Sequence, residues 1–222
     1  MPRFRDIPSP ADYAATVAAM AAHASAIRAG TGGEEVWLLE HHPVLTGGTS
    51  ASEADLINPG STPVHTTGRG GQWTWHGPGQ RVAYVMLDLA ARTPDVRAYV
   101  SSLEGWIIDV LGQFGIEGTR RDGNPGIWVD AGDRMDKVAA IGVRISRWVT
   151  WHGVAVNLDP DLSAFDAIVP CGVTDGGVTS LHRLGAQVDM AMLDAALRSS
   201  FATHFPDPVP DLGPNPGLNP GP

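Results

Sequence analysis

The chain has 222 residues, 43% of them hydrophobic, which is enough to bury one large core without disulfides or metals. Its 24 acidic and 15 basic side chains give a net charge of −9, so its field repels a phosphate backbone and nucleic acid is not an expected partner. One cysteine, no secretory signal and no apolar run long enough to span a bilayer favour a cytoplasmic protein with no membrane association.

Three helices are predicted from their capping residues and apolar spacing. The first covers residues 10–30, with the hydroxyl of Ser9 as its N-cap. The second covers residues 93–115, where apolar side chains keep helical spacing until a glycine ends the pattern. The third follows Asp189 and covers residues 190–205. Each is long enough to cover part of a sheet.

Short runs rich in β-branched and aromatic residues separate these helices and predict strands. Several are joined by connections too short for a crossover helix, so much of the sheet must be antiparallel. We therefore expect an α/β (α+β) fold with a mixed, largely antiparallel sheet and flanking helices. The predicted strands cover residues 36–40, 63–67, 72–76, 81–89, 126–130, 138–146 and 151–158.

The chain divides into a long globular part and a short tail. Residues 206–222 contain seven prolines and three glycines among 17 residues. Such a segment cannot bury enough apolar surface to offset its ordering entropy, so we expect an extended or disordered appendage. One domain over residues 1–205 carries the function.

Cys171 is the single thiol, and it lies between Pro170 and Gly172 in AIVPCGVTDGG. Free cysteines are often small buried hydrophobes. A rigid proline before it and an open glycine after it instead favour a nucleophile presented to a substrate. A thiol needs a cationic or basic neighbour to react at neutral pH. The candidates for that neighbour are Lys137, His76, His152 and Arg144.

Lys137 is the single lysine of the chain and begins the apolar strand KVAAIGVRIS. It could be a solvated residue at a strand edge. Placed beside a thiol, its charge would lower the thiol pKa and it could exchange a proton with the reacting groups.

The stretch RGGQWTWHGPGQ, residues 69–80, combines paired glycines with two tryptophans and a histidine. It could be a hairpin with one polar face, but paired glycines also let backbone amides approach a ligand. It lacks the order of a phosphate loop, and no serine elbow occurs elsewhere. Adjacent His41 and His42 face opposite sides of a strand, so no metal site is expected.

Taken together, four motifs resemble the octanoyltransferase family, the lipoyl(octanoyl) transferases of lipoate biosynthesis. They occur in the family's order, and GIWV and VTSL also fit, so the resemblance covers roughly residues 10–205. One departure lies at residues 39–50, where Leu45 and Thr49 replace an expected aromatic residue and arginine. The four motifs are RGGQWTWHGPGQ (69–80), KVAAIGVRIS (137–146), WHGVAVNL (151–158) and IVPCGV (168–173).

The resemblance implies the fold of the lipoate and biotin protein ligase catalytic domain. It implies that Cys171 is the acyl-thioester nucleophile and that Lys137 lowers its pKa. No cofactor is implied, because a thioester is already an activated acyl donor. The residues that it places in an acyl pocket are Arg69, Gly70, Gly71, Gln72, Trp73, Thr74, Trp75, His76, Ala140, Ile141, Gly142, Gly153, Val154 and Ala155.

The implied reaction moves octanoyl from octanoyl-acyl carrier protein to a lysine of a lipoyl domain. Acceptors would be the glycine cleavage H protein and the E2 subunits of 2-oxoacid dehydrogenases, and the chain would act as a monomer. Three alternatives stay open. They are an ATP-dependent lipoate or biotin ligase, an octanoyl relay between lipoyl domains, and an acyl-binding protein without catalysis.

Overall fold

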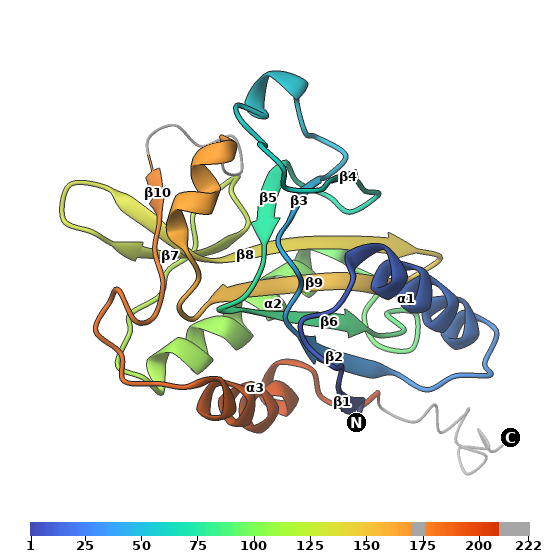
Figure 1. Cartoon of the computed structure of the whole chain (residues 1–222). Helices are drawn as coiled ribbons and strands as arrows, with labels where there is room; N and C mark the ends of the chain where they lie inside the picture. The colour runs from blue at the N-terminus through green and yellow to red at the C-terminus, as the bar shows by residue number, and fades with distance from the viewer. Residues whose placement is uncertain (170–175, 209–222) are drawn as a thin grey trace, which may run out of the picture.

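A mixed sheet runs through the centre of the molecule, with helices on both of its faces (Figure 1). The computed structural model describes residues 1–169 and 176–208. Along the main path the strands have the order β1-β2-β6-β9-β8-β10, and β7 pairs with the first half of β8. The strands are β1 (Arg3–Asp6), β2 (Glu35–Leu39), β6 (Gln80–Met86), β7 (Gly126–Asp130), β8 (Met135–Ser146), β9 (Val149–Asn157) and β10 (Gly176–Val178).

Most strand pairs of this sheet are antiparallel. Within the described ranges, β1–β2 and β10–β8 are parallel, whereas β2–β6, β6–β9, β9–β8 and β7–β8 are antiparallel. The fold-class prediction, a mixed and largely antiparallel sheet with flanking helices, is therefore confirmed.

A second, smaller sheet stands beside the first (Figure 1). It has the order β4-β3-β5, from β3 (Val44–Gly47), β4 (Val64–Thr66) and β5 (Trp73–His76). The 3₁₀ helices η1 (Glu53–Asp55) and η2 (Leu162–Ala167) lie near it. Because β5 leads directly into β6 of the large sheet, the small sheet brings residues 69–76 over the central strands.

The helices form as their caps predict, with one shift. Asp95 caps α2 (Val96–Gly112) and Asp189 caps α3 (Met190–His204), each by accepting bonds from first-turn amides. The first helix, α1 (Tyr13–Arg28), begins later than predicted, because Asp12 and not Ser9 is its N-cap. The Ser9 hydroxyl instead donates to the Ile7 carbonyl and accepts from the Glu40 amide.

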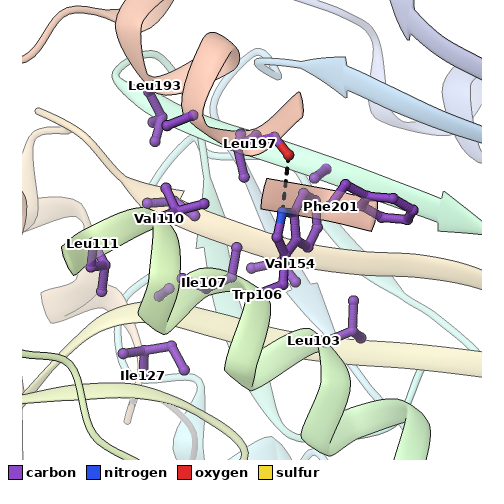
Figure 2. Close-up of a cluster of buried hydrophobic side chains, with 14 of the residues drawn as sticks. Leu103, Trp106, Ile107, Val110, Leu111, Ile127, Val154, Leu193, Leu197 and Phe201 are labelled. Carbon is purple, nitrogen blue, oxygen red and sulfur yellow. Dashed lines mark hydrogen bonds between the residues drawn. The ribbon is translucent and has the colours of Figure 1, made fainter. Parts of the chain in front are cut away.

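Two apolar cores lie on opposite faces of the large sheet. Helices α2 and α3 cover one face, where Trp106 is fully buried and donates its indole N–H to the Leu197 carbonyl at 3.0 Å (Figure 2). Helix α1 covers the other face, where Met20 and Ala24 pack against Trp37 and Tyr84. A sheet covered on both faces gives a rigid support for the strands that carry the functional residues.

All seven predicted strands are present, with ends within three residues of the prediction. Strands β1, β3 and β10 were not predicted. The first has the charged sequence RFRD and the last the glycine-rich sequence GGV, and both compositions disfavour strands. Pairing with β2 and β8 supplies the hydrogen bonds that stabilise them.

Two glycines face each other across the middle of the sheet. Gly142 of β8 pairs in register with Gly153 of β9, so neither strand places a side chain there. A Cβ at Gly142 would lie 3.1 Å from Arg69 Cδ and 3.2 Å from the Gly70 carbonyl oxygen, and one at Gly153 would lie 2.2 Å from the Ala83 carbonyl oxygen. Gly142 therefore lets Arg69 and Gly70 approach the sheet closely, and Gly153 lets β9 lie close to the β6 backbone.

The last described residues continue from α3 along the body of the molecule. The Pro206 carbonyl accepts from Arg92, and Asp207 pairs with the N-terminal ammonium. The tail predicted over 206–222 lies mostly outside the described residues, which end at 208. No helix in the described part of the chain is both long and apolar enough to cross a membrane.

We expect Gly153→Ala to lower the free energy of unfolding by about 1–3 kcal/mol, because the added Cβ collides with the β6 backbone. Urea titration followed by tryptophan fluorescence measures this change. Gly112→Ala is the matched control: its Cβ meets nothing within 4 Å, so it should be neutral or stabilise by up to about 1 kcal/mol. An unchanged midpoint in Gly153→Ala would contradict the prediction.

Candidate active site

A cavity of about 420 Å³ opens where the 69–76 segment crosses the glycine pair of β8 and β9. Glycines of the 69–76 segment and of strands β8 and β9 line it together with several large side chains. Thirteen of the fourteen residues predicted to form the acyl pocket line it, together with Lys137. They are Arg69, Gly70, Gly71, Gln72, Trp73, Thr74, His76, Ala140, Ile141, Gly142, Gly153, Val154 and Ala155.

The remaining predicted residue, Trp75, lies elsewhere. Its ring packs edge-on against Phe165 of η2 with the centroids 5.6 Å apart, in the apolar cluster of the small sheet. Trp73 belongs to the same cluster, and its indole N–H donates to the Ser52 carbonyl at 2.7 Å. Trp73 nevertheless contributes to the cavity wall, whereas Trp75 serves packing. Trp73 and Trp75 are two residues apart on β5, so strand alternation places them on the same side and does not predict which of them lines the cavity.

Cys171 lies outside the described residues, within the 170–175 gap. The chain on either side of the gap is held by backbone pairing. The Val169 amide donates to the Asp55 carbonyl at 2.8 Å, and β10 begins at Gly176. Val178 of β10 pairs directly with Lys137 of β8.

Lys137 is 5% exposed, so it is not a solvated residue at a strand edge. Its Nζ donates to the Pro125 carbonyl at 3.3 Å and lies 4.6 Å from the ring centroid of Trp128. None of the ion pairs within residues 1–169 and 176–208 includes it. Neighbouring Asp136 pairs with Arg134 at 2.8 Å instead. The cavity therefore contains a buried ammonium with no carboxylate partner among the described residues.

A chain of buried amides fixes the orientation of His76. Asn157 Nδ2 donates to the Thr179 carbonyl at 2.9 Å, and Gln80 Nε2 donates to Asn157 Oδ1 at 3.0 Å. Gln80 Oε1 must then accept from His76 Nδ1 at 2.7 Å. This assignment places the proton of the neutral imidazole on Nδ1 and leaves Nε2 as an acceptor at the cavity.

The imidazoles around the cavity and the Tyr84 hydroxyl are held neutral. Burial lowers the pKa of His76 to about 3, and burial together with the charge of Arg69 lowers the pKa of His152 to about 3. Burial also lowers the pKa of His41 and raises the pKa of Tyr84 well above its usual value. Neutral His41 accepts from the Tyr84 hydroxyl at 2.7 Å.

Arg69 is the second buried cation of the site. It is 6% exposed, and its Nη2 donates to the carbonyl and hydroxyl of Thr46 at 2.7 and 2.8 Å and to the Gln72 carbonyl at 3.0 Å. Its Nη1 donates to the Gly70 carbonyl at 3.0 Å. These hydrogen bonds hold the glycine loop against the Arg69 side chain, and both line the cavity.

Several lining residues were not predicted, among them Val82, Tyr84, Val96, Val100 and Asn124. They come from β6, from the first turns of α2 and from the turn before β7. No short motif marks them, because the sheet order and not the sequence spacing brings them together. The sequence signal that exists is the turn DGNPG at residues 122–126, whose Asn124 and Pro125 reach the cavity.

The described residues contain no group of three His, Cys, Asp or Glu side chains placed to hold a metal ion. The imidazoles near the cavity contact one another and Tyr84 through their rings instead. His41 and His76 have centroids 5.9 Å apart, and Tyr84 and His152 have centroids 5.8 Å apart.

Comparison with known proteins defines the family of this site. The model of the lipoyl protein ligase A/B catalytic domain matches residues 12–202, and the chain belongs to this family. Curated octanoyltransferases are close relatives. The one from Paramagnetospirillum magneticum is 57% identical over 198 residues, covering 89% of this chain and 93% of the relative. The one from Caulobacter vibrioides is 57% identical over 200 residues, covering 88% of each chain.

Solved structures support the fold. A putative lipoate protein ligase from T. acidophilum superposes with a TM-score of 0.69 at 13% identity, over 92% of this chain and 85% of that one. A lipoate-protein ligase A bound with ATP superposes with a TM-score of 0.68 at 14% identity, over the same shares of both chains. At this identity the likeness concerns the fold alone.

Folding stability should fall as the pH is lowered from about 7. Between the ordinary pKa of 6.5 and the folded pKa of about 3, His76 and His152 take up protons in the unfolded chain but not in the folded one. Each group can then remove up to about 1.4 kcal/mol of stability per pH unit. Urea unfolding between about pH 7.5 and 5 measures the slope.

Two variants test the source of this slope. His76→Gln removes one titrating group, so stability should depend less steeply on pH even where the variant is less stable overall. His42→Gln is the control, because His42 is exposed and hydrated in both states. Equal slopes in all three proteins would contradict the burial of neutral imidazoles.

Proposed function

We propose that this chain is an octanoyltransferase that moves an octanoyl group from octanoyl-acyl carrier protein to a lysine of a lipoyl domain, through a thioester on Cys171. The observation that carries the proposal is the buried ammonium of Lys137, which has no carboxylate partner in residues 1–169 and 176–208, at a cavity lined by the predicted acyl-binding segments. The relatives named octanoyltransferase match nearly the whole chain. The proposed acceptors are glycine cleavage H protein and the lipoyl domains of 2-oxoacid dehydrogenase E2 subunits. The chain would act on them as a monomer in the cytoplasm.

Strand pairing supports the partnership of Cys171 with Lys137. Gly176, five residues after Cys171, begins β10, and Val178 of that strand pairs with Lys137. Strand β10, which begins five residues after the cysteine, therefore runs alongside the lysine. An ammonium near a thiol stabilises the thiolate and lowers its pKa, which raises the fraction of nucleophile at neutral pH.

Lys137 loses a proton in the first half of the reaction and regains one in the second, so the enzyme returns to its starting state. In the first half, the Cys171 thiolate attacks the donor thioester, and the departing carrier thiolate takes a proton from the Lys137 ammonium. In the second half, the acceptor amine attacks the Cys171 thioester and gives a proton to the now neutral Lys137. The Cys171 thiolate leaves as the amide forms. Overall, thioester and amine become amide and thiol, and no ATP is consumed.

The cavity offers an apolar wall and a polar end to an acyl chain. Val82, Ile141 and Val154 contribute apolar surface, and the glycine pair leaves room beside them. Burying the seven apolar carbons of an octanoyl chain at about 0.8 kcal/mol each supplies on the order of 5 kcal/mol. The neutral His76, with an acceptor nitrogen at the cavity, adds no competing charge.

The alternatives that the sequence leaves open differ in their acyl donor, in their need for ATP and in their need for a cysteine nucleophile. An ATP-dependent ligase shares this fold, as the likeness to lipoate-protein ligase A shows, but needs no cysteine nucleophile. A relay enzyme would use the same thiol with a different donor. An acyl-binding protein would form no covalent adduct. Formation of a covalent adduct, its donor and its requirement for ATP therefore separate all four proposals.

Incubation with octanoyl-acyl carrier protein, without ATP, should give one octanoyl adduct by intact mass spectrometry. Hydroxylamine should remove it, as expected for a thioester. Cys171→Ser should form no such hydroxylamine-labile adduct, whereas Ser50→Ala, at the exposed rim of the cavity, should retain it. Absence of the adduct would reject the transferase, a requirement for ATP would favour the ligase, and acylation only from an octanoylated lipoyl domain would favour the relay.

Lys137→Met keeps most of the length of the unbranched side chain and removes its charge. At about pH 7 we expect adduct formation to slow by about 100-fold, because the thiolate fraction falls and the leaving group loses its proton donor. Raising the pH to about 9 should restore part of the rate by ionising the thiol directly. A variant with native rates at neutral pH would remove Lys137 from the mechanism.

A further inference from the structure

The pairing of β7 with β8 contains an irregularity beside Lys137, which lines the cavity. Ile127 pairs with Ala139 of β8, but the next residue, Trp128, pairs with Lys137, so β8 has one extra residue, Val138, at this point. Such a bulge changes which side chains face each other across two strands. Here it sets the only lysine of the chain directly opposite a tryptophan.

The ring of Trp128 is a contact surface for the Lys137 ammonium. Trp128 is 1% exposed and Lys137 is 5% exposed, and Nζ lies 4.6 Å from the ring centroid. A cation over an indole face is attracted by the ring quadrupole, most strongly where water is excluded. The guanidinium of Arg121 lies 4.8 Å from the same ring.

Trp128 also fixes the turn that supplies the other contact of the ammonium. Its indole N–H donates to the Asn124 carbonyl at 3.1 Å, and the next carbonyl, of Pro125, accepts from Lys137 Nζ. The backbone of Gly126 lies close to the lysine side chain, since a Cβ at this position would lie 3.3 Å from Lys137 Cε. One side chain therefore sets both the ring and the carbonyl that hold the ammonium.

We propose that Trp128 is the positioning residue of Lys137: its ring face, set opposite the lysine by the bulge in β7–β8, holds the ammonium at the cavity in place of a carboxylate. A carboxylate partner would hold the ammonium by a full opposite charge and weaken its pull on a thiolate. A quadrupole holds it without neutralising it. The inference rests on the proposed function for its catalytic consequence, but the contact itself can be observed without any substrate.

Lysine labelled with ¹³C reports on one side chain, because Lys137 is the single lysine. In the native chain its Cε protons should lie upfield of those of an exposed lysine, owing to the ring current of Trp128. Trp128→Leu should abolish this shift and slow octanoyl transfer about tenfold. Trp128→Phe retains a ring without the indole N–H, so it should keep part of the shift and part of the rate.

Trp106→Leu is the matched control. Trp106 is also fully buried, but it packs between α2 and α3 (Figure 2) and contacts Leu197. It should lose comparable stability while keeping the lysine shift and the transfer rate per folded molecule. If Trp128→Leu does not fold, the comparison of Trp128→Phe with Trp106→Leu decides.

The outcomes separate the two proposals. An unshifted lysine signal in the native chain, or a shift that survives Trp128→Leu, overturns the contact. A lost shift with native transfer rates in Trp128→Leu overturns the positioning role and leaves the proposed function intact. Absence of transfer in the native chain refutes the proposed function and with it any catalytic consequence of Trp128, while the shift still shows whether the ring holds the ammonium.

Discussion

The buried ammonium of Lys137 is the constraint on which the site depends. A cation removed from water needs compensating contacts, and within the described residues Lys137 has a carbonyl and an aromatic ring but no ion pair. Such a charge is incompletely compensated. It is available to stabilise a negative charge that forms beside it, which is what a thiolate in an acyl transfer requires.

The surroundings preserve this state by keeping other charges away. The histidines and Tyr84 are neutral at physiological pH, because burial lowers the pKa of His76 and His152 to about 3 and raises that of Tyr84. Arg69 is engaged by carbonyl oxygens. A chain with a net charge of −9 thus lines one cavity with two cations and neutral rings, a local field opposite to that of the whole molecule.

The architecture serves this chemistry through close backbone approach. The pair Gly142 and Gly153 removes side chains from the middle of two central strands, and the loop held by Arg69 fills part of the space. The remaining space is lined partly by apolar side chains, as an acyl chain requires. Helices on both faces keep the strands from relaxing into it.

Much of this arrangement could be predicted from the sequence, and the failures have physical causes. Capping residues located two helices with their ends within three residues of the prediction, whereas Ser9 was taken for a cap because Asp12 lay inside the predicted helix. The motif residues predicted for the pocket, apart from Trp75, line one cavity. Trp75 packs in the small sheet and does not line this cavity. Tyr84 and Trp128 were not predicted, because their positions beside the cavity arise from pairing between distant strands and, for Trp128, from a one-residue bulge that local patterns do not encode.

The central claim concerns the influence of the lysine charge on the single thiol, and the pH dependence of Cys171 alkylation by iodoacetamide measures it most directly. With one cysteine in the chain, the rate reports on one thiolate. The account predicts a thiol pKa below the ordinary value of about 8.5 in the native protein, and a rise by at least about one unit in Lys137→Met. An identical pKa in both proteins would contradict it.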